Sequence, residues 1–386
     1  MEYRLEELFD LQMGKTPSRS VTEYWESGNN KWISIADLSK CGKYIYDTKE
    51  CLSDIAVSES GIKQIPANTV VMSFKLSIGK TAITSEPMYS NEAIMSFRDR
   101  KLVQLLPEYI YYLLLSKNWD DGTNKAVMGK TLNKATLSKV KVNIHSMQEQ
   151  QEIVYVLNQA TALIELHQQQ LQKLDELVKA RFVELFGDPI SNPHGFDKVD
   201  LSELADIKIG PFGSLLHKGD YIEGGYALLN PSHIIDGKIA PDSELTVSRE
   251  KYEELSAYHL KAGDVVMGRR GEMGRCAVVP CDGYLCGTGS LLIRTKGDVT
   301  ADYIQKIISF PSFKKAIEDM AVGQTMPNLN VPIVSRFQII KPPIEVQHSY
   351  YAFVEQTDKS KLQVPSGNAL CIRYPIFIEM MFLRGV

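Results

Sequence analysis

The sequence predicts a mixed α+β protein in which one long coiled-coil helix separates two related globular domains. Three observations support this fold class. An uninterrupted helical pattern occupies the middle of the chain, the segments before it recur in the same order after it, and both halves alternate short strand-like and helical runs. At 386 residues the chain is long enough for two or three domains, each with its own core.

The central helical stretch runs from Met147 to Phe186 and contains neither Pro nor Gly. Its apolar residues recur at alternating steps of four and three, which is typical of a coiled-coil seam. A helix of this kind would be about 60 Å long, at roughly 1.5 Å per residue. The alternative is a long core helix of one domain, and His167 on the seam is interpreted as a packed polar residue. The seam residues predicted to form a subunit interface are Ile153, Leu157, Ile164, Leu171, Leu174, Val178 and Leu185.

Residues 1–146 are predicted to form the first domain. A short helix, LEELF, is followed by a strand that ends at Gly14, and alternation over Lys31–Asp37 predicts a second strand. Asn68–Lys80 reads as two strands joined by a turn. Pro107–Lys117 has Pro at its start and an apolar face, which predicts a helix.

The central helix, residues 147–187, is predicted to end at Gly187, where FGDPISNPHGF supplies a helix stop and a linker. Residues 188–343 then repeat the first domain at an offset near 195. LEELFDLQMG at residue 5 returns as LSELADIKIG at residue 201, and IPANTVVMSFKLSIGKTAI at residue 65 returns as LKAGDVVMGRRGEMGRCAV at residue 260. A tandem duplication explains this order. Residues 344–361 repeat the start of the long helix, and residues 362–386 form a divergent tail in which Pro365 and Gly367 break any helix.

Composition excludes several classes of protein. The net charge of −4 gives no general basic field, so any nucleic-acid contact must be local. The first residues do not resemble a secretory signal, and no apolar run approaches the roughly 18 residues of a membrane span. Six scattered Cys without a CxxC pair are interpreted as structural thiols rather than a metal site. We therefore expect a cytoplasmic protein that does not enter a membrane.

Catalytic motifs are missing from the sequence. It contains no GxxxxGK[ST] phosphate loop, and GTGSLL at Gly287 lacks the third glycine of a dinucleotide fingerprint. The run Asn230-Pro231-Ser232-His233 lacks the second Pro and the aromatic residue of an amino-methyltransferase loop and is interpreted as a turn. We expect neither a catalytic site nor a metal site.

Basic residues instead recur around glycine in the repeated hairpin. Arg on a tight turn can bond guanine bidentately, whereas Lys mostly neutralises phosphate. A solvated hairpin edge is the alternative. The hairpin residues predicted to bind DNA are Lys75, Lys80, Arg269, Arg270 and Arg275, of which Lys75 matches Arg270 and Lys80 matches Arg275.

A second candidate follows in each half. No acidic residue occurs from Gly122 to Gln148, where several Lys gather, and its counterpart, Ala321–Ile344, is also free of acid. Amide side chains in the second copy suit the edges of bases. A solvated charged face is again the alternative. The residues predicted to bind DNA here are Lys125, Lys130, Lys134, Gln324, Asn328 and Asn330.

Two diverged domains, each followed by a long helix, resemble the specificity (S) subunit of type I restriction-modification enzymes. The junction VELFGDPISNPHGF and the segments LSELADIKIGPFGSLL and KAGDVVMGRRGEMGR carry the resemblance, which covers about residues 1–361. It implies a non-catalytic subunit in which each domain recognises one half of a split double-stranded DNA sequence and the helices pair. It also implies two modification subunits docked on the helices, with S-adenosylmethionine, and restriction subunits with ATP and Mg. No cofactor is expected on this chain itself.

The C-terminus departs from the family pattern, because the second helix is predicted to stop near Lys361. This truncated or altered helix would leave Ile164–Leu185 partly unpaired, available for self-association or for a modification subunit. Two other functions remain open. One is a coiled-coil interaction scaffold without a role in DNA binding, and the other is a recognition module of a fused methyltransferase-type enzyme.

Overall fold

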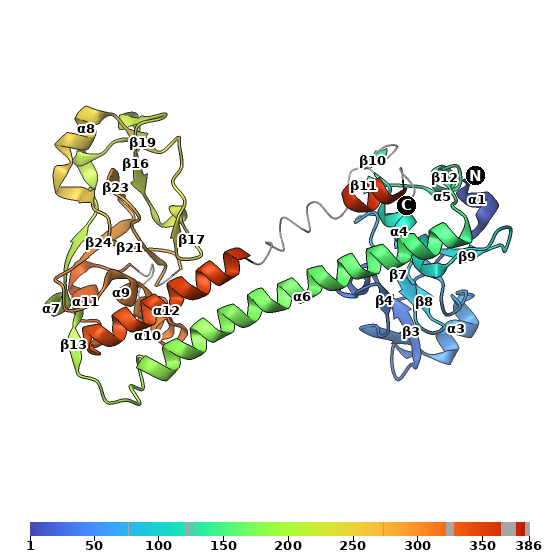
Figure 1. The fold of residues 1–386 in the computed structure, drawn as a ribbon, viewed down its shortest axis with the longest axis horizontal. Helices are drawn as coiled ribbons and strands as arrows, with labels where there is room; N and C mark the ends of the chain where they lie inside the picture. Colours follow the sequence, from blue (N-terminus) through green and yellow to red (C-terminus); the bar gives the residue numbers. More distant parts are fainter. Residues whose placement is uncertain are drawn as a thin grey trace. The chain divides into compact units, whose positions relative to one another are not determined.

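The computed structural model describes residues 1–75, 77–119, 124–126, 129–272, 274–321, 328–363 and 376–382 (Figure 1). The chain forms two compact units. Unit 1 comprises Met1–Leu171 together with Val364–Val386, and unit 2 comprises Gln172–Gln363. Helix α6 spans Met147–Phe186, as predicted, so its first part belongs to unit 1 and its last part to unit 2.

Unit 1 combines a five-stranded sheet of order β2-β9-β6-β7-β4 with a three-stranded sheet of order β5-β3-β8. Its strands are β1 (Glu2–Arg4), β2 (Phe9–Met13), β3 (Asn30–Ile33), β4 (Tyr44–Ile45), β5 (Glu50–Leu52), β6 (Val70–Ser73), β7 (Thr81–Thr84), β8 (Tyr89–Ser90), β9 (Ile94–Asp99), β10 (Asn124–Ala126), β11 (Gly129–Thr131) and β12 (Lys141–Asn143). Besides α6, its α-helices are α1 (Leu5–Leu8), α2 (Ile35–Lys40), α3 (Asp54–Ser60), α4 (Pro107–Leu115) and α5 (Lys134–Ser138).

Unit 2 repeats this plan with a sheet of order β14-β24-β21-β22 and a five-stranded sheet of order β15-β19-β16-β23-β20. Its strands are β13 (Lys198–Asp200), β14 (Ala205–Ile209), β15 (Tyr221–Ile222), β16 (Tyr226–Leu229), β17 (Ile234–Ile235), β18 (Lys238–Ile239), β19 (Thr246–Val247), β20 (His259–Leu260), β21 (Val265–Gly268), β22 (Cys276–Val278), β23 (Tyr284–Cys286), β24 (Ser290–Thr295) and β25 (Gln338–Ile340). Its α-helices are α7 (Leu201–Leu204), α8 (Arg249–Glu254), α9 (Ala301–Ile308), α10 (Pro311–Ala321), α11 (Val331–Ser335) and α12 (Ile344–Gln363).

The duplication is confirmed by matching strand pairs. β2 pairs with β9 and β9 with β6, all antiparallel, as β14 pairs with β24 and β24 with β21. The parallel pair of β3 with β8 returns as that of β16 with β23. The first and last strands of each domain also pair, β1 with β12 and β13 with β25. Each repeat therefore folds around its own sheets.

One predicted strand is wrong in part. The expected strand Lys31–Asp37 ends at Ile33 as β3, and helix α2 begins at Ile35. Ser34 caps this helix: the backbone N–H of Asp37 donates to Ser34 Oγ (3.3 Å), and the backbone N–H of Ser34 donates to Asp37 Oδ2 (2.8 Å). This capping box satisfies two donors at once, so it outweighs the alternating pattern. The helix at Pro107 and the hairpin near Val70 are confirmed.

A buried glutamine near the start of each long helix fixes the backbone of its unit. Gln150 Oε1 accepts the N–H of Leu106 (3.1 Å), and its Nε2 donates to the carbonyl oxygen of Gln104 (3.0 Å). In unit 2, Gln347 Oε1 accepts the N–H of Thr300 (3.0 Å), and its Nε2 donates to the carbonyl oxygen of Pro342 (3.1 Å). The side chains satisfy backbone groups that lead into α4, α9 and α12.

The seam of α6 has two different environments. Ile153 and Leu157 are buried in the core of unit 1, and Val178 and Leu185 pack in the core of unit 2. Their role is therefore packing within this chain, which corrects the prediction of a subunit interface for these four residues. The three that keep solvent exposure, and to which that prediction still applies, are Ile164, Leu171 and Leu174.

Helix α12 pairs with the last part of α6 inside unit 2. The rings of Phe182 and Tyr350 meet with centroids 5.5 Å apart, and Lys361 Nζ lies 2.8 Å from Asp175 Oδ1. α12 ends at Gln363, close to the predicted stop near Lys361. The aromatic contacts show that the shorter helix still covers the seam over this stretch, so the prediction of an unpaired seam as far as Leu185 is wrong for unit 2.

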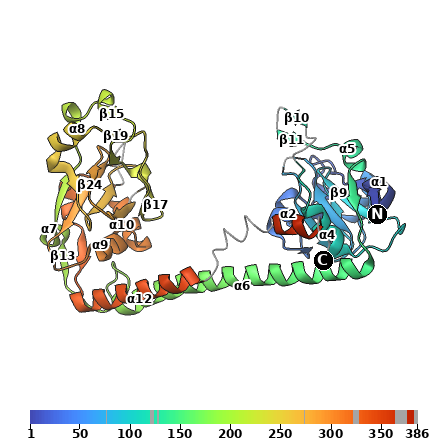
Figure 2. The ribbon, with the colours of Figure 1, turned by 45° about the horizontal axis from the view of Figure 1, so that its top comes forward.

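The C-terminal tail contributes to the core of unit 1. Residues 376–382 are helical and lie beside α4 (Figures 1 and 2). Ile378 is only 2% exposed, and the rings of Phe382 and Tyr109 lie 5.3 Å apart. In unit 2 the equivalent contact joins Phe186, near the end of α6, to Tyr303 at 5.2 Å. The tail thus occupies in unit 1 the position that the end of α6 occupies in unit 2, which its sequence did not predict.

Candidate nucleic-acid interface

The predicted basic turns are closed in the same way in both units. In unit 1 the backbone N–H of Ser73 donates to the carbonyl oxygen of Lys80 (2.9 Å). In unit 2 the backbone N–H of Gly268 donates to the carbonyl oxygen of Arg275 (2.8 Å). Gly79 and Gly274 have φ angles of +87° and +72°, which favour glycine at the same point of both turns. The register confirms that Lys80 and Arg275 are equivalent.

The second predicted segment lies against the turn in each unit. The N–H of Leu132 donates to the carbonyl oxygen of Phe74, and the N–H of Leu329 donates to that of Arg269, both at 3.0 Å. The structure therefore brings together the two candidate segments that the sequence left apart. We call this combination, the turn 74–80 with 129–133 in unit 1 and the turn 269–275 with 328–330 in unit 2, the turn edge.

The basic residues of unit 1 differ in their surroundings. Lys80 is exposed, whereas Lys75 is half-buried with Nζ 5.3 Å from the centroid of the Phe74 ring. Lys125 and Lys130 face each other across the β10–β11 pair, and their side chains lie outside the described residues. Lys134 instead lines a pocket with Glu6 and Asp10, so carboxylates there compete with any phosphate.

Several predicted residues of unit 2 are engaged within the chain. Arg269 Nε donates to the carbonyl oxygen of Leu329 (3.1 Å), and Arg275 Nη2 donates to Glu272 Oε2 (2.8 Å). Asn330 Oδ1 accepts the N–H of Ile333 (3.0 Å) and caps α11. These side chains hold the turn edge in shape, and their contact with DNA remains a prediction.

Arg270 remains as the exposed cation of the second turn. No carboxylate pairs with it in the part of the chain that the structure describes. Asn328 is half-buried, and its Oδ1 finds no hydrogen-bond partner among the described residues. Gln324 lies outside the described residues. An exposed arginine without a paired carboxylate is suited to bidentate contact with guanine.

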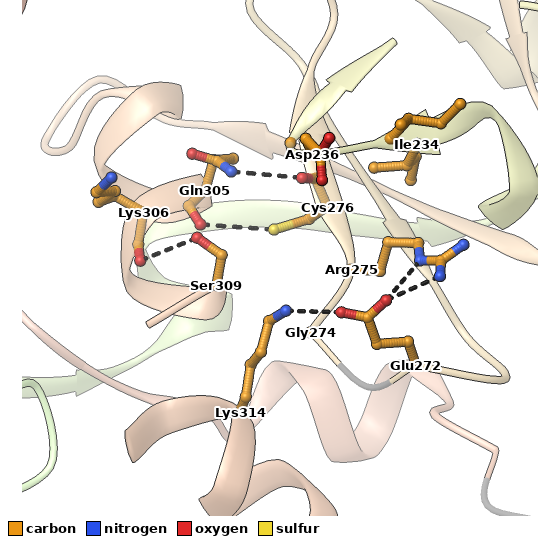
Figure 3. A pocket seen from close by; sticks show the side chains of 12 residues that line it. Ile234, Asp236, Glu272, Gly274, Arg275, Cys276, Gln305, Lys306, Ser309 and Lys314 are labelled. Atoms are coloured by element: carbon orange, nitrogen blue, oxygen red, sulfur yellow. Dashed lines mark hydrogen bonds and ion pairs between the residues drawn. The ribbon is translucent and has the colours of Figure 1, made fainter. Parts of the chain in front are cut away.

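A polar cavity of about 430 Å³ lies beneath the second turn, between it, α9 and α10 (Figure 3). Glu272 lies between two cations there: Lys314 Nζ is 2.9 Å from its Oε1, and Arg275 binds its Oε2. The pKa of Glu272 is lowered to about 2, first by its hydrogen bond from Lys314 and second by its hydrogen bond from Arg275. The ion pair with Lys314 joins the turn to α10, and both ion pairs neutralise the carboxylate. The charged groups in this cavity therefore stabilise the fold.

Metal sites and membrane-spanning helices were sought among the described residues. Among them, no three His, Cys, Asp or Glu side chains gather closely enough to hold a metal ion. Within the same ranges, no helix combines the length and apolar character that crossing a bilayer requires.

The turn edge is one end of the main sheet, a feature that local sequence patterns did not reveal. In unit 2, Ile209 at the end of β14 pairs with Leu291 of β24, and Gly268 at the end of β21 pairs with Ser290 of the same strand. In unit 1, Met13 of β2 and Ser73 of β6 end likewise against β9. The loop after the first long strand of each repeat therefore emerges beside the basic turn.

Comparison with known proteins gives a consistent result. The family model for the type I restriction modification DNA specificity domain matches residues 1–176 and 193–366. The MjaIX specificity subunit of Methanocaldococcus jannaschii is 24% identical over 384 residues, covering 91% of this chain and 85% of that protein. The EcoR124I/EcoR124II specificity subunit of Escherichia coli is 27% identical over 184 residues, covering 43% of this chain and 44% of that protein.

Solved structures show the same fold. The S subunit of a type I restriction-modification system from M. genitalium superposes with a TM-score of 0.57 at 13% identity, covering 100% of this chain and 96% of that one. A second chain comes from a structure that describes complex assembly and conformational transition of the type I R-M system. It superposes with a TM-score of 0.67 at 13% identity, covering 100% of this chain and 98% of that one.

Proposed function

The chain belongs to the family of type I restriction-modification specificity subunits, and from this premise we propose that each of its units reads one half of a bipartite DNA target. The observation that carries the proposal is the turn edge. Both units hold an equivalent basic turn against an equivalent second segment through the same backbone hydrogen bond. A duplicated edge of this kind fits a target that is split into two parts.

Within this function the chain is a recognition subunit without catalysis of its own. Its sequence contains no phosphate loop or methyltransferase motif. S-adenosylmethionine would be bound by the modification subunits, and ATP and Mg by the restriction subunits. We place this assembly in the cytoplasm, where the DNA is accessible to it.

The partners would dock on α6. Two modification subunits are expected, one for each repeat. The half-buried part of the seam, Ile164, Leu171 and Leu174, is the apolar surface that a partner helix would cover. Self-association of two copies through this surface is the alternative.

Mapping of methylated adenines tests the proposal and identifies the target. Cells that carry this gene together with its modification subunit should methylate one bipartite sequence, and cells that lack the gene should not. The purified complex should then bind a duplex of that sequence with an affinity that falls with salt. If about four phosphates are neutralised, the affinity drops about 10²-fold between 50 and 200 mM salt. A scaffold without a role in DNA binding would show neither result.

Arg270→Ala tests which residue reads the second half-site. A bidentate contact with guanine contributes about 1–3 kcal/mol of discrimination. We expect this variant to lose about that much discrimination at one position of the half-site read by unit 2, with the other half-site unchanged. Arg249→Ala, at an exposed arginine of α8 paired with Glu253, is the matched control. Equal losses at both half-sites would contradict the assignment of one half-site to each unit.

A further inference from the structure

The loop that follows β14 presents a phenylalanine to solvent. Phe212 is 63% exposed, although the preceding Pro211 is buried. In this chain most large aromatic side chains are buried or half-buried in the cores of the two units. A single exposed apolar side chain is common on protein surfaces, so it is the place of Phe212 beside the basic turn that indicates a contact outside the chain.

The backbone of this loop is tightly held. The N–H of Gly210 donates to the carbonyl oxygen of Ser290 (3.1 Å), and a Cβ at Gly210 would lie 2.0 Å from the carbonyl oxygen of Gly287. Gly213 has a φ of +63° and opens a 3₁₀ turn, Gly213–Leu215. Phe212 therefore follows a backbone segment that is hydrogen-bonded to the neighbouring strand, and such pre-ordering lowers the entropy lost on binding.

Phe212 and Arg270 emerge at the same edge of the sheet. β14 and β21 flank β24, and the N–H of Arg269 donates to the carbonyl oxygen of Gly289, just before β24 begins (2.9 Å). Two strand spacings of about 4.8 Å separate the stems by about 10 Å. The major groove of DNA is about 12 Å wide, so one groove can receive both side chains.

We propose that Phe212 contacts the 5-methyl group of a thymine in the half-site read by unit 2, in the same major groove as Arg270. The thymine methyl is the apolar group that base edges present in this groove, and it is a known partner of Phe. This inference rests on the proposed function of the turn edge.

Unit 1 carries a different side chain at the matching position. Gly14 aligns with Gly210, so Thr16 aligns with Phe212. Thr16 Oγ1 donates to the carboxylate of Glu92. The apolar contact is therefore a property of unit 2, and the two half-sites are read with different chemistry.

Deoxyuridine scanning tests the contact, because it removes only the methyl group. In the complex with the modification subunit, each thymine of the unit 2 half-site is replaced in turn, and affinity is measured for the unmodified protein and for Phe212→Ala. We expect one position at which deoxyuridine weakens binding of the unmodified protein about three- to five-fold. Phe212→Ala should lose a similar factor on the thymine duplex and show no further loss with deoxyuridine there.

Ile222→Ala is the matched control, because Ile222 is also an exposed apolar residue of unit 2 (44%) but lies on β15 of the other sheet. It should bind like the unmodified protein, and both variants should keep the unmodified melting temperature.

Three results would overturn the contact: a unit 2 half-site without thymine on either strand, losses that add fully between Phe212→Ala and every deoxyuridine, or 2-aminopurine fluorescence showing that Phe212 unstacks bases as a wedge. If the salt-dependent binding and the effect of Arg270→Ala are present while Phe212 has no effect, only this inference fails. If those two are missing, the proposed function itself fails.

Discussion

Single side chains determine the local stability of each repeat, and the buried glutamines show this most directly. Gln150 and Gln347 each accept one backbone N–H, and their amide groups donate to backbone carbonyl oxygens, those of Gln104 and His145 for Gln150 and that of Pro342 for Gln347. Pro342 lies only five residues before Gln347, but Thr300 lies 47 residues away, too far to be found from local patterns. The glutamine is therefore a link between distant segments.

Gln347→Leu should destabilise unit 2 by about 2–4 kcal/mol, because it leaves the N–H of Thr300 and the carbonyl oxygen of Pro342 buried without partners. Urea unfolding followed by far-UV circular dichroism measures the change. All three Trp (Trp25, Trp32 and Trp119) lie in unit 1, so tryptophan fluorescence reports that unit separately and should not change. Gln356→Leu, at an exposed position of the same helix, is the control. Equal destabilisation by the two variants would contradict the role of Gln347.

The charge on Glu272 makes the stability of unit 2 depend on pH. Its pKa is lowered from 4.5 to about 2, so the ion pairs stabilise the folded state above about pH 4.5 and this stabilisation is lost as the pH falls towards 2. Because the carboxylate is half-exposed, Glu272→Gln should lower the melting temperature at pH 7 by only about 1–3 °C. The difference from the unmodified protein should shrink between pH 4.5 and pH 2.

The matched control for this experiment is Glu318→Gln, at an exposed carboxylate on the same helix α10. A melting-temperature difference for Glu272→Gln that stays constant from pH 7 to pH 2.5 would show that the ion pairs with Lys314 and Arg275 do not stabilise the fold.

At the scale of elements, the short tail helix 376–382 substitutes for a helix that the repeat would otherwise lack. In unit 2, the end of α6 supplies the aromatic contact to Tyr303, and in unit 1 the tail supplies the contact to Tyr109. The spacing of the buried residues is also the same, since Ile378 and Phe382 are four residues apart, as are Phe182 and Phe186. One face of one helical turn is therefore enough to complete the core.

Ile378→Ala should destabilise unit 1 by about 2–4 kcal/mol, because it leaves a cavity in a core where this side chain is almost fully buried. The midpoint of urea unfolding by tryptophan fluorescence should fall. Ile376→Ala changes the same residue type on the same helix at a position that is 56% exposed, and it should leave the midpoint nearly unchanged. If the two variants behave alike, the tail does not contribute to the core of unit 1.

At the scale of the whole molecule, the apolar seam of α6 has two kinds of surroundings along its length. Its ends pack into the cores of the units, and the half-buried Ile164, Leu171 and Leu174 lie between those ends. A change at these positions should thus affect assembly without affecting folding, whereas a change at Leu157 or Val178 should affect folding first.

Ile164→Glu should weaken binding of the modification subunit by at least about ten-fold, since it places a charge in an apolar contact. Titration calorimetry or co-purification with the modification subunit measures the effect, and tryptophan fluorescence should show unchanged unfolding of unit 1. Gln169→Glu adds the same charge at an exposed polar position of α6 and serves as control. Unchanged binding by Ile164→Glu would place the docking surface elsewhere.

Local patterns were sufficient for the long helix, its stop at Gly187, the order of the duplicated segments and the basic turns. These features depend on periodicity and on neighbours within a few residues, which a sequence displays directly. They also carried the resemblance to specificity subunits, which the family match confirms.

The interaction partners of individual polar and apolar side chains were determined only by the tertiary structure. Arg275 and Asn330 were predicted to bind DNA and also form hydrogen bonds within unit 2. The tail was predicted only to diverge from the repeat, but its residues 376–382 enter the core of unit 1. The position of Phe212 beside Arg270 follows from the strand order. The physical reason is the same in each case. Hydrogen bonds, ion pairs and core contacts join residues that are brought together by strand register and helix packing, so their partners are set by tertiary structure rather than by sequence spacing.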